Sequence, residues 1–401
     1  MMLEVSFIIS THNRRDLLLN TLAHVHKCGL APERFDCFVI DNDSTDGTSD
    51  AVAAAFPGVL LRRENINRGS CAKNLALPDV RSRLIVFLDD DSYPEPGSIQ
   101  RMIDHFDRHP ALAAASFSVR LPDGSRECSA YPNVFIGCGV GLRTAALRQV
   151  GGLPHDFFMQ AEEYDLSLRL LNAGWRVESF DDLLVMHLKS PQARRSSRVM
   201  RLDVRNNLLL ARRYFPRRWV RPFAADWLRR YYRIAAAKQQ RVAFFAGALQ
   251  GLFASPPRIR RRPISDVAFE MFAKVRTIED RLRVAREILD IRSLLFIDLG
   301  KNVLPFYLAA RKLGIRVVAV ADPRLCGSRY RGIPIVDDED ARTYAFDAAI
   351  VANVSPVHVA QRRAAWRESE HHRPVIDLFE PGSPWDMNAE EIGSERLRDA
   401  A

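Results

Sequence analysis

The chain has no uninterrupted apolar stretch that could cross a membrane. A spanning helix needs about 20 predominantly apolar residues, and the sequence has no run of even about 18. Its first ten residues lack both a basic segment and a cleavage site, so they predict a first strand and not a signal peptide. We therefore expect a protein of the cytoplasm, with peripheral attachment to the inner face of the cell membrane as an alternative.

Cysteine is scarce and irregularly spaced. The spacing matches neither a metal site nor a disulfide framework, which favours a reducing compartment; the positions are Cys28, Cys37, Cys71, Cys128, Cys138 and Cys326. The composition, 47% hydrophobic and 27% charged, is typical of a soluble globular protein. A length of 401 residues allows two or three domains.

Strand and helix patterns alternate through the first 120 residues. Such a rhythm predicts an α/β fold with a doubly wound, mainly parallel sheet. The expected strands cover 5–9, 37–40, 59–61 and 84–88, and the expected helices cover 14–28, 45–55 and 70–77. Residues 111–190 are more mixed, with strands expected at 113–119 and 177–180, helices at 144–150 and 165–172, and a glycine-rich stretch at 137–141.

The rest of the chain changes character twice. Residues 191–290 are basic and mainly helical, with breaks expected at Pro216, Pro222 and Pro256-Pro257. From about residue 292 strands and helices alternate again, which predicts a second, smaller α/β unit. The predicted domains are therefore 1–190, 191–290 and 291–385, followed by a tail at 386–401.

Three consecutive carboxylates, Asp89, Asp90 and Asp91, follow the apolar run 84–88. They repel one another unless a cation neutralises them, and hard divalent cations prefer oxygen ligands and bridge to substrate phosphates. The alternative is a solvated acidic turn that opens a helix, with Pro94 and Pro96 close behind. If the strand continued through this triplet, Asp89 and Asp91 would share one side and Asp90 would face the other.

Three other polar segments are weak signals when taken singly. The loop 10–14 opens a helix and could contact a phosphate or a ribose. Asp41 ends a strand and could accept a hydrogen bond from a base, although its surroundings are also ordinary turn residues. The acids at 161–169 could be functional or could only favour a helix N-terminus.

Taken in order, these segments resemble the family 2 glycosyltransferases, which have the GT-A fold. The resemblance covers about residues 3–215. The family patterns T-x-N-R, V-D-N-x-S-x-D-G, N-x-G-x-x-x-x-N, L-D-D-D-x-x-P, G-E-D-x-D-L-x-x-R and G-x-x-V correspond to residues 11–14, 40–47, 67–74, 88–94, 161–169 and 174–177. The chain departs from them at Ile40 for valine, Ala161 for glycine and Glu163 for aspartate.

The resemblance implies a role for each matching residue. Asp89 and Asp91 would face Mg²⁺ or Mn²⁺, with His187 as a further ligand; the alternative for His187 is a satisfied histidine at a strand end. Glu163 would be the general base, with Glu162 as its substitute. The residues implied to bind the donor are Thr11, Asn13, Arg14, Asp41, Asn67, Asn74 and Asp90.

The implied reaction is an inverting transfer of a sugar from a nucleoside-diphosphate sugar to a hydroxyl of a saccharide or lipid-linked saccharide acceptor, in the synthesis of a cell-surface polysaccharide. Asp41 suits a UDP- or a dTDP-sugar, because both bases offer the same N–H. A nucleotidyltransferase is an alternative, but a glycine-rich, lysine-bearing phosphate loop is absent near the N-terminus. A non-catalytic nucleotide-sugar-binding scaffold is another, and the intact acids argue against it.

Residues 191–260 have very few acids. They contain 17 arginines and lysines against two aspartates, so this segment carries +15 while the whole chain carries +9. No nucleic-acid motif accompanies this charge. We therefore expect an anionic membrane surface as the partner; the alternative is a basic helical cap packed on the preceding domain or on a second subunit.

The C-terminal unit resembles small Rossmann-like domains. Its loop at 298–303 lacks G-x-G-x-x-G, so dinucleotide binding is poorly supported. Asp322 lies where a ribose-binding acid would lie, which is a weak signal. A domain that serves assembly is the other interpretation, and a homo-oligomer therefore stays open.

Overall fold

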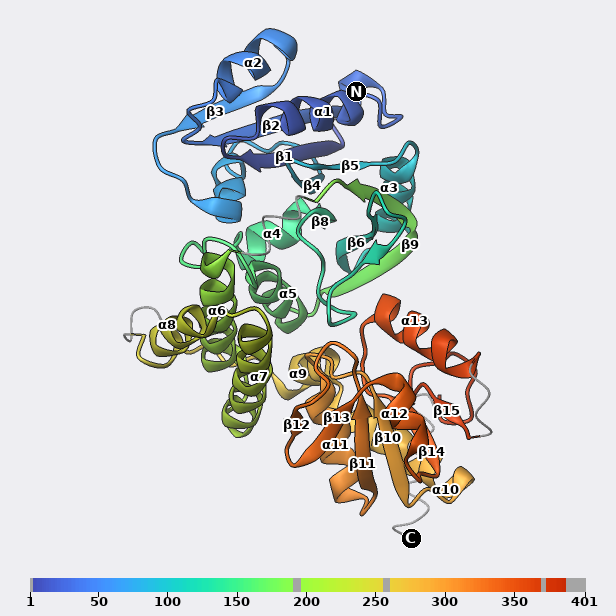
Figure 1. Cartoon of the computed structure of the whole chain (residues 1–401). Coiled ribbons are helices and arrows are strands. Elements are labelled where there is room, and N and C mark those ends of the chain that lie inside the picture. Colours follow the sequence, from blue (N-terminus) through green and yellow to red (C-terminus); the bar gives the residue numbers. More distant parts are fainter. Residues whose placement is uncertain (1–2, 190–195, 255–259, 369–372, 387–401) are drawn as a thin grey trace. The chain divides into compact units, whose positions relative to one another are not determined.

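The computed structural model describes residues 3–189, 196–254, 260–368 and 373–386. Its contacts divide the chain into two compact units, residues 1–272 and 273–401, whose elements are labelled in Figure 1. Within the described ranges, no helix combines the length and apolar character that crossing a membrane requires. The break expected at Pro256-Pro257 and all but the first residue of the expected tail lie outside the described residues.

The first unit is built on one mixed sheet in the order β3-β2-β1-β4-β8-β6-β9-β5, with β7 attached to β6. The first four strands of this order are parallel, whereas β8 is antiparallel to both of its neighbours. The prediction of a mainly parallel, doubly wound sheet is therefore confirmed. The strands are β1 (Val5–Thr11), β2 (Phe35–Asn42), β3 (Leu60–Glu64), β4 (Leu84–Asp89), β5 (Ser92–Pro94), β6 (Leu112–Arg120), β7 (Arg126–Glu127), β8 (Gly139–Arg143) and β9 (Arg176–His187).

Helices cover both faces of this sheet, which explains why the central strands are apolar throughout. One face packs on α1 (Arg15–Val25), α2 (Thr48–Ala55) and α3 (Ser98–Arg108). The remaining short elements are η1 (Pro32–Arg34), the 3-10 helix η2 (Gly69–Ala76), α4 (Thr144–Val150) and α5 (Glu162–Asn172). The sequence predicted a helix at 70–77, but it did not predict that this helix is a 3-10 helix.

Strand β9 is interrupted by a bulge. It pairs with β6 as far as Phe117 with Phe180, and pairing resumes at Ser118 with Leu184. The last residues of β9 also pair with β5, so that His187 lies opposite Ser92. The bulge therefore separates a first half of β9, which pairs with β6, from a second half, which pairs with both β6 and β5 and ends beside the acidic triplet.

The basic segment is helical, as predicted. It contains α6 (Ser197–Tyr214), α7 (Arg217–Ala237) and α8 (Arg241–Leu252). Pro216 precedes α7, but Pro222 lies inside it, so the break predicted at Pro222 is wrong. The helix continues because its buried side chains Phe223, Trp227 and Tyr231 stabilise it through packing, which outweighs one lost hydrogen bond.

The unit boundary falls in α9 (Asp266–Ala273), so α10 (Val275–Leu289) belongs to the second unit. The second unit has a smaller sheet in the order β12-β13-β11-β10-β14-β15, which is parallel except for the β12–β13 pair. This confirms the predicted second α/β sheet. Its other elements are β10 (Ser293–Ile297), α11 (Val303–Lys312), β11 (Arg316–Ala321), β12 (Arg329–Tyr330), β13 (Ile333–Val336), α12 (Asp338–Thr343), β14 (Ala348–Val351), α13 (Pro356–Arg367) and β15 (Val375–Ile376).

Candidate active site

Three adjacent parallel strands of the first unit end with polar side chains at the same edge. Thr11 ends β1 and pairs with Asp41 on β2, while Ser10 pairs with Asp89 on β4. Because these strands run in the same direction, their carboxyl ends bring Thr11, Asp41 and Asp89 to one edge of the sheet. Open α/β sheets bind ligands at this edge.

Asp41 is buried and held in place by its own turn. Its carboxylate accepts hydrogen bonds from the backbone N–H of Ser44, at 3.0 Å, and from the hydroxyl of Ser49. Asn13 supports the same turn, because its side-chain oxygen accepts a 2.7 Å hydrogen bond from the N–H of Thr45. Asn13 and Asp41, which are both predicted to contact the donor, therefore both hydrogen-bond to the turn that follows β2.

The acidic triplet does not keep strand geometry. Strand β4 ends at Asp89, and Asp90 and Asp91 form a turn before β5. The condition for a period-two alternation through the triplet is therefore not met. The turn and not the pleat directs the three carboxylates: Asp89 faces Lys73, whereas Asp90 and Asp91 share Arg14.

Arg14 neutralises the two acids of the turn. Its guanidinium lies 3.2 Å from Asp90 and 2.6 Å from Asp91. Thr11 donates a 2.9 Å hydrogen bond to Asp90. Burial raises the pKa of Asp90 to about 7, aided by the charges of Asp91 and Asp89 and opposed by Arg14. The predicted donor residues Thr11, Arg14 and Asp90 thus form one connected group.

Asp89 has a partner that the sequence did not identify. The ammonium of Lys73, on η2, lies 2.8 Å from Asp89 and 3.4 Å from the carbonyl oxygen of Gly137. The Lys73 side chain is only 2% exposed. Burial acts to lower the pKa of Lys73, but the charge and hydrogen bond of Asp89 raise it above its ordinary value. Lys73 is therefore a buried, permanent positive charge beside the acidic turn.

His187 reaches the triplet from the end of β9. Its two ring nitrogens lie 3.3 Å from Asp91 and 3.0 Å from Glu127 on β7. Burial acts to lower the pKa of His187, but hydrogen bonds with Asp91, Cys138 and Glu127 raise it to about 12. Without a metal the ring is thus a cation between two carboxylates.

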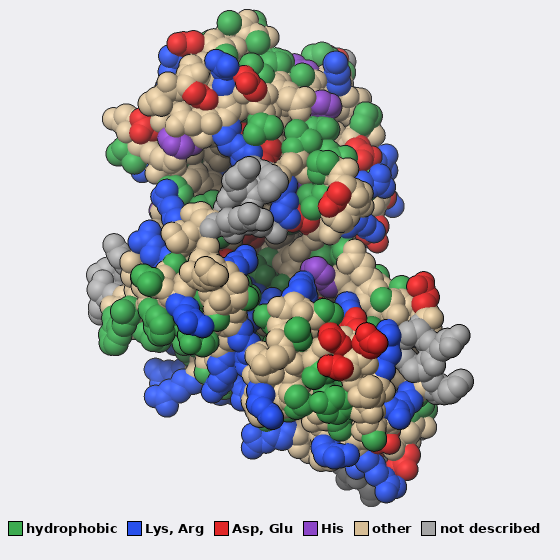
Figure 2. Space-filling model, in the orientation of Figure 1, with side chains coloured by type: hydrophobic (Ala, Val, Ile, Leu, Met, Phe, Trp, Pro, Cys, Tyr) green, Lys and Arg blue, Asp and Glu red, His purple; other side chains and the backbone are tan. Residues whose placement is uncertain are grey.

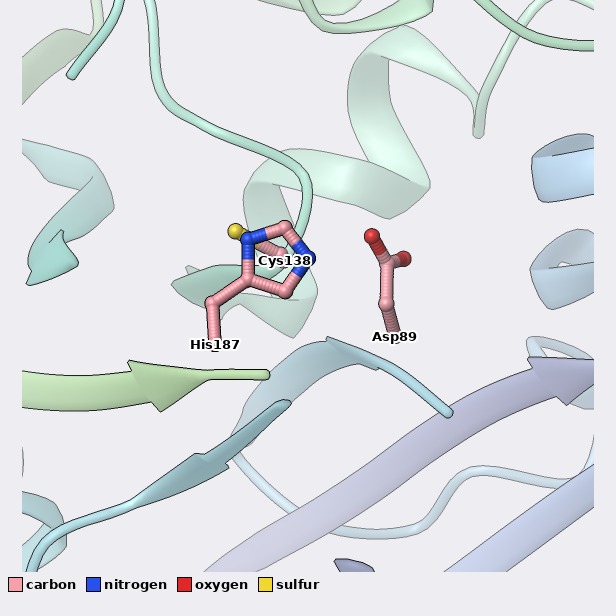
Figure 3. A group of neighbouring side chains, drawn as sticks. All are labelled: Asp89, Cys138 and His187. Carbon is pink, nitrogen blue, oxygen red and sulfur yellow. The ribbon is translucent and has the colours of Figure 1, made fainter. Parts of the chain in front are cut away.

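One group at this edge has the donor types and spacing of a metal site. Ligand atoms of Asp89, Cys138 and His187 all lie within 4.8 Å of one another, and Figure 3 shows the three side chains pointing together. Carboxylates suit Mg²⁺ and Mn²⁺, and an imidazole is a common further ligand, whereas a thiolate selects softer ions. Asp89 and His187 therefore fit the predicted ions. Cys138 fits them less well, and burial raises the pKa of its thiol. Asp91, the other predicted ligand, is not part of this group: it lies 3.3 Å from His187 and is paired with Arg14.

Two glutamates begin α5 and face different surroundings. Glu162 is buried, with one carboxylate oxygen lacking a hydrogen-bond partner among the described residues, and burial followed by the charge of Glu163 raises its pKa far above the ordinary value. Glu163 is half-buried. A Cβ at Gly137 would lie 3.0 Å from a carboxylate oxygen of Glu163. The glycine-rich stretch therefore leaves room for Glu163.

The loop that leads into α5 is conformationally strained. Phe158, Gln160 and Ala161 all have positive φ, and Ala161 is the N-cap of α5 at φ 64°. Such conformations favour glycine and cluster at functional sites. Asn206 on α6, fully buried, secures the loop, since its amide lies within 3.1 Å of the carbonyl oxygens of Phe157, Met159 and Gln160.

The two remaining predicted donor residues have partners within the protein. Asn74 uses both atoms of its amide on the backbone of Leu153, at 2.7 and 2.8 Å. Asn67 accepts a hydrogen bond from the N–H of Gly69 and so shapes its own turn. The geometry gives both a positioning role, and contact with a donor stays a prediction.

The sequence of the first unit is similar to known proteins. Residues 6–149 match the model of the family described as glycosyl transferase family 2. An N-acetylglucosaminyl-diphospho-decaprenol L-rhamnosyltransferase from Mycobacterium tuberculosis is 29% identical over 213 residues, which cover 40% of this chain and 69% of the relative.

Solved structures also resemble the chain. The mannosyltransferase PcManGT from Pyrobaculum calidifontis, in complex with GDP-Man and Mn²⁺, is 20% identical with a TM-score of 0.48 and covers 63% of this chain and 88% of its own. S. aureus TarS 1–349 in complex with UDP-GlcNAc is 14% identical with a TM-score of 0.47, over 78% and 93%.

Proposed function

From the premise that this chain is a glycosyltransferase of family 2, we propose that it moves a sugar from a nucleoside-diphosphate sugar to a hydroxyl of a saccharide or lipid-linked saccharide. One observation carries the proposal: the acidic turn at 89–91, the base-recognition candidate Asp41 and the glutamates of α5 belong to one connected site. Lys73 links two of these parts, because its ammonium contacts both Asp89 and the carbonyl oxygen of Gly137, and Gly137 lies beside Glu163.

The donor would lie along the carboxyl ends of β2, β1 and β4. Asp41 would accept the N–H of a uracil or thymine base, so UDP- and dTDP-sugars are the donors to test first. Asp90, next to Thr11, would contact the ribose or the sugar. Arg14 would hold the two acids of the turn in place and approach the diphosphate.

Asp89, Asp91 and His187 would hold Mg²⁺ or Mn²⁺. When bound, such an ion supplies a positive charge that stabilises the leaving nucleoside diphosphate. His187 must lose its proton to bind the ion, and Glu127 then keeps the ring oriented through the other nitrogen. Lys73 remains beside Asp89 as a second positive charge.

Glu163 would be the general base. Glu163 is half-buried, whereas Glu162 is buried, and burial raises the pKa of Glu162 far above its ordinary value. Of the two glutamates, Glu163 is therefore the better placed to meet an acceptor hydroxyl as a carboxylate. A single base opposite the leaving group needs no covalent intermediate, which implies direct displacement and inversion at the anomeric carbon. Glu162 is retained as the alternative base.

The decisive experiment measures donor hydrolysis and transfer with a panel of UDP-, dTDP- and GDP-sugars. Glu163→Gln should lose turnover by about a hundredfold or more, the size of a general-base contribution, while binding of the nucleoside diphosphate stays intact. Glu33→Gln, an exposed acid of η1, is the matched control.

Each alternative has its own result in this experiment. Near-normal turnover in Glu163→Gln together with loss in Glu162→Gln would transfer the role to Glu162. A nucleotidyltransferase would transfer no sugar from this panel, and it would release pyrophosphate in a parallel reaction that contains a nucleoside triphosphate and a sugar phosphate. Tight nucleotide-sugar binding without turnover on any acceptor would indicate a scaffold.

The acceptor class rests on two supports. The Mycobacterium tuberculosis relative is named for a diphospho-decaprenol-linked saccharide, which is a lipid-linked acceptor. The basic helices α6 to α8 belong to the same unit as the site, and an anionic membrane surface would attract them. We therefore place the protein in cell-surface polysaccharide synthesis, at the inner face of the cell membrane.

A further inference from the structure

Helix α8 is apolar on all sides. Its 12 residues, Arg241–Leu252, contain one charged residue, at the first position, and no acid. A helix of this kind is normally enclosed by protein or by lipid. Among the residues that the structure describes, protein covers one side of α8 and leaves the opposite side exposed.

The inner side of α8 packs very closely on α6. A Cβ at Gly247 would lie 2.4 Å from the carbonyl oxygen of Arg201, and one at Gly251 would lie 2.8 Å from Leu208. Arg212 of α6 donates hydrogen bonds to the carbonyl oxygens of Gly251 and Leu252, which caps the end of α8. This attachment fixes which side of α8 faces outward.

The outer side carries large apolar side chains that are exposed to solvent. Together with Tyr232 of α7 they form what we call the α8 face: Tyr232 42%, Val242 85%, Phe245 55%, Leu249 57%, Leu252 45% and Phe253 79% exposed. Figure 2 shows apolar side chains gathered over α8. An apolar patch of this kind on a protein surface marks an interaction site.

Three basic residues lie next to the α8 face: Arg229 is one helical turn before Tyr232 on α7, Lys238 follows the end of α7, and Arg241 begins α8. Arg229, Lys238 and Arg241 are exposed, and none of them forms a salt bridge with any residue that the structure describes. Figure 2 shows basic side chains over α7 next to the apolar ones. Acids are nearly absent, since residues 197–253 contain 13 arginines and lysines against Asp203 and Asp226.

We infer that the α8 face inserts into the surface of an anionic lipid bilayer, with Arg229, Lys238 and Arg241 on the lipid headgroups. An apolar face bordered by unpaired basic residues is complementary to this surface, whose interior is apolar and whose headgroups are negative. A helix of 12 residues is about 18 Å long, and the hydrocarbon core is about 30 Å thick, so α8 lies in the plane of the interface. The inference deepens the proposed function, because it states where the enzyme meets a lipid-linked acceptor.

The test is flotation of the full-length protein with vesicles of phosphatidylcholine alone and of phosphatidylcholine with phosphatidylglycerol, without any donor or acceptor. The parent protein should bind the anionic vesicles more tightly, and salt should weaken this binding. Phe245→Ser/Leu249→Ser should lower the bound-to-free ratio by about tenfold or more, because it removes two inserting side chains. Leu60→Ser/Ile66→Ser, which changes two residues of similar exposure at 48% and 55%, should bind like the parent.

A triple variant, Arg229→Gln/Lys238→Gln/Arg241→Gln, should lose the preference for anionic vesicles. Equal binding by the parent and the Phe245→Ser/Leu249→Ser variant would overturn the inference. So would a parent that binds neither vesicle, or a dimer that this variant converts to a monomer, since the α8 face would then cover a second copy. Sugar transfer to a water-soluble acceptor is measured in parallel. The Phe245→Ser/Leu249→Ser variant should transfer sugar as fast as the parent, because only the α8 face is changed. A parent that binds anionic vesicles but transfers no sugar would count against the proposed function and not against this inference.

Discussion

The buried charge of Lys73 gives the most detailed prediction. Replacing Lys73 by methionine keeps a side chain of similar length but removes the ammonium that contacts Asp89 and the carbonyl oxygen of Gly137. Replacing it by alanine removes the side chain beyond Cβ as well. Comparing the two variants therefore separates the charge from the packing.

The magnitude follows from these contacts. A hydrogen bond to a charged group contributes about 1.5–3 kcal/mol. Asp89 is 43% exposed and can be rehydrated, so the lower end applies, and Lys73→Met should lose about 1–2 kcal/mol of unfolding free energy. Lys73→Ala loses three further buried methylenes at about 0.8 kcal/mol each, for a total near 4 kcal/mol.

Thermal unfolding followed by tryptophan fluorescence measures both variants. The second unit contains Trp366 and Trp385 and serves as an internal reference. One kcal/mol corresponds to about 2–4 °C in a unit of this size. In the proposed site a divalent cation would compete with Lys73 for Asp89, so Mn²⁺ should raise the midpoint of Lys73→Met more than that of the parent. A midpoint of Lys73→Met equal to the parent's, or a smaller response to Mn²⁺, would refute this reasoning.

Three further predictions concern the same unit. Ala161→Gly should raise unfolding stability by about 1 kcal/mol, since glycine adopts the positive φ of this N-cap without strain; an unchanged or lower midpoint would contradict this. Asn206→Ala should lower stability by about 1–3 kcal/mol and increase hydrogen exchange in residues 157–161, while the exposed Gln250→Ala on α8 should change neither. The pKa of Asp90 is raised to about 7, so the folded state binds a proton that the unfolded state releases, and stability in EDTA should fall as pH rises from about 4 to 7. Denaturation midpoints across this range should be flatter for Asp90→Asn, and an equally steep decline in that variant would contradict the assignment.

The sequence predicted the parts of the fold that have a strong local pattern. The helix expected at 144–150 matches α4 to the residue, and the apolar strand at 84–88 differs from β4 by one residue. Hydrophobic periodicity and glycine at the helix ends carry this information. Pro222 was misjudged because a proline signals a break locally, whereas packing along the rest of α7 decides whether the helix continues.

The site was harder to predict than the fold where contacts join distant residues. Glu127 lies on a two-residue strand without periodicity, and it meets His187 from 60 positions away. Lys73 belongs to a short helix on which a lysine is normally solvated, and Asn206 lies within an arginine-rich helix. No pattern in the residues around them indicates burial. Their roles depend on tertiary packing alone.

The bulge in β9 affects which changes of length the strand can tolerate. Residues 181–183 have no pairing partner on β6, so the two halves of β9 are held by separate pairings. The register that sets His187 opposite Ser92 comes from β5 and from the end of β6, which pairs with residues 184–186, and not from the start of the strand. An insertion or deletion before residue 181 should therefore be absorbed at the bulge, and His187 should keep its place opposite Ser92.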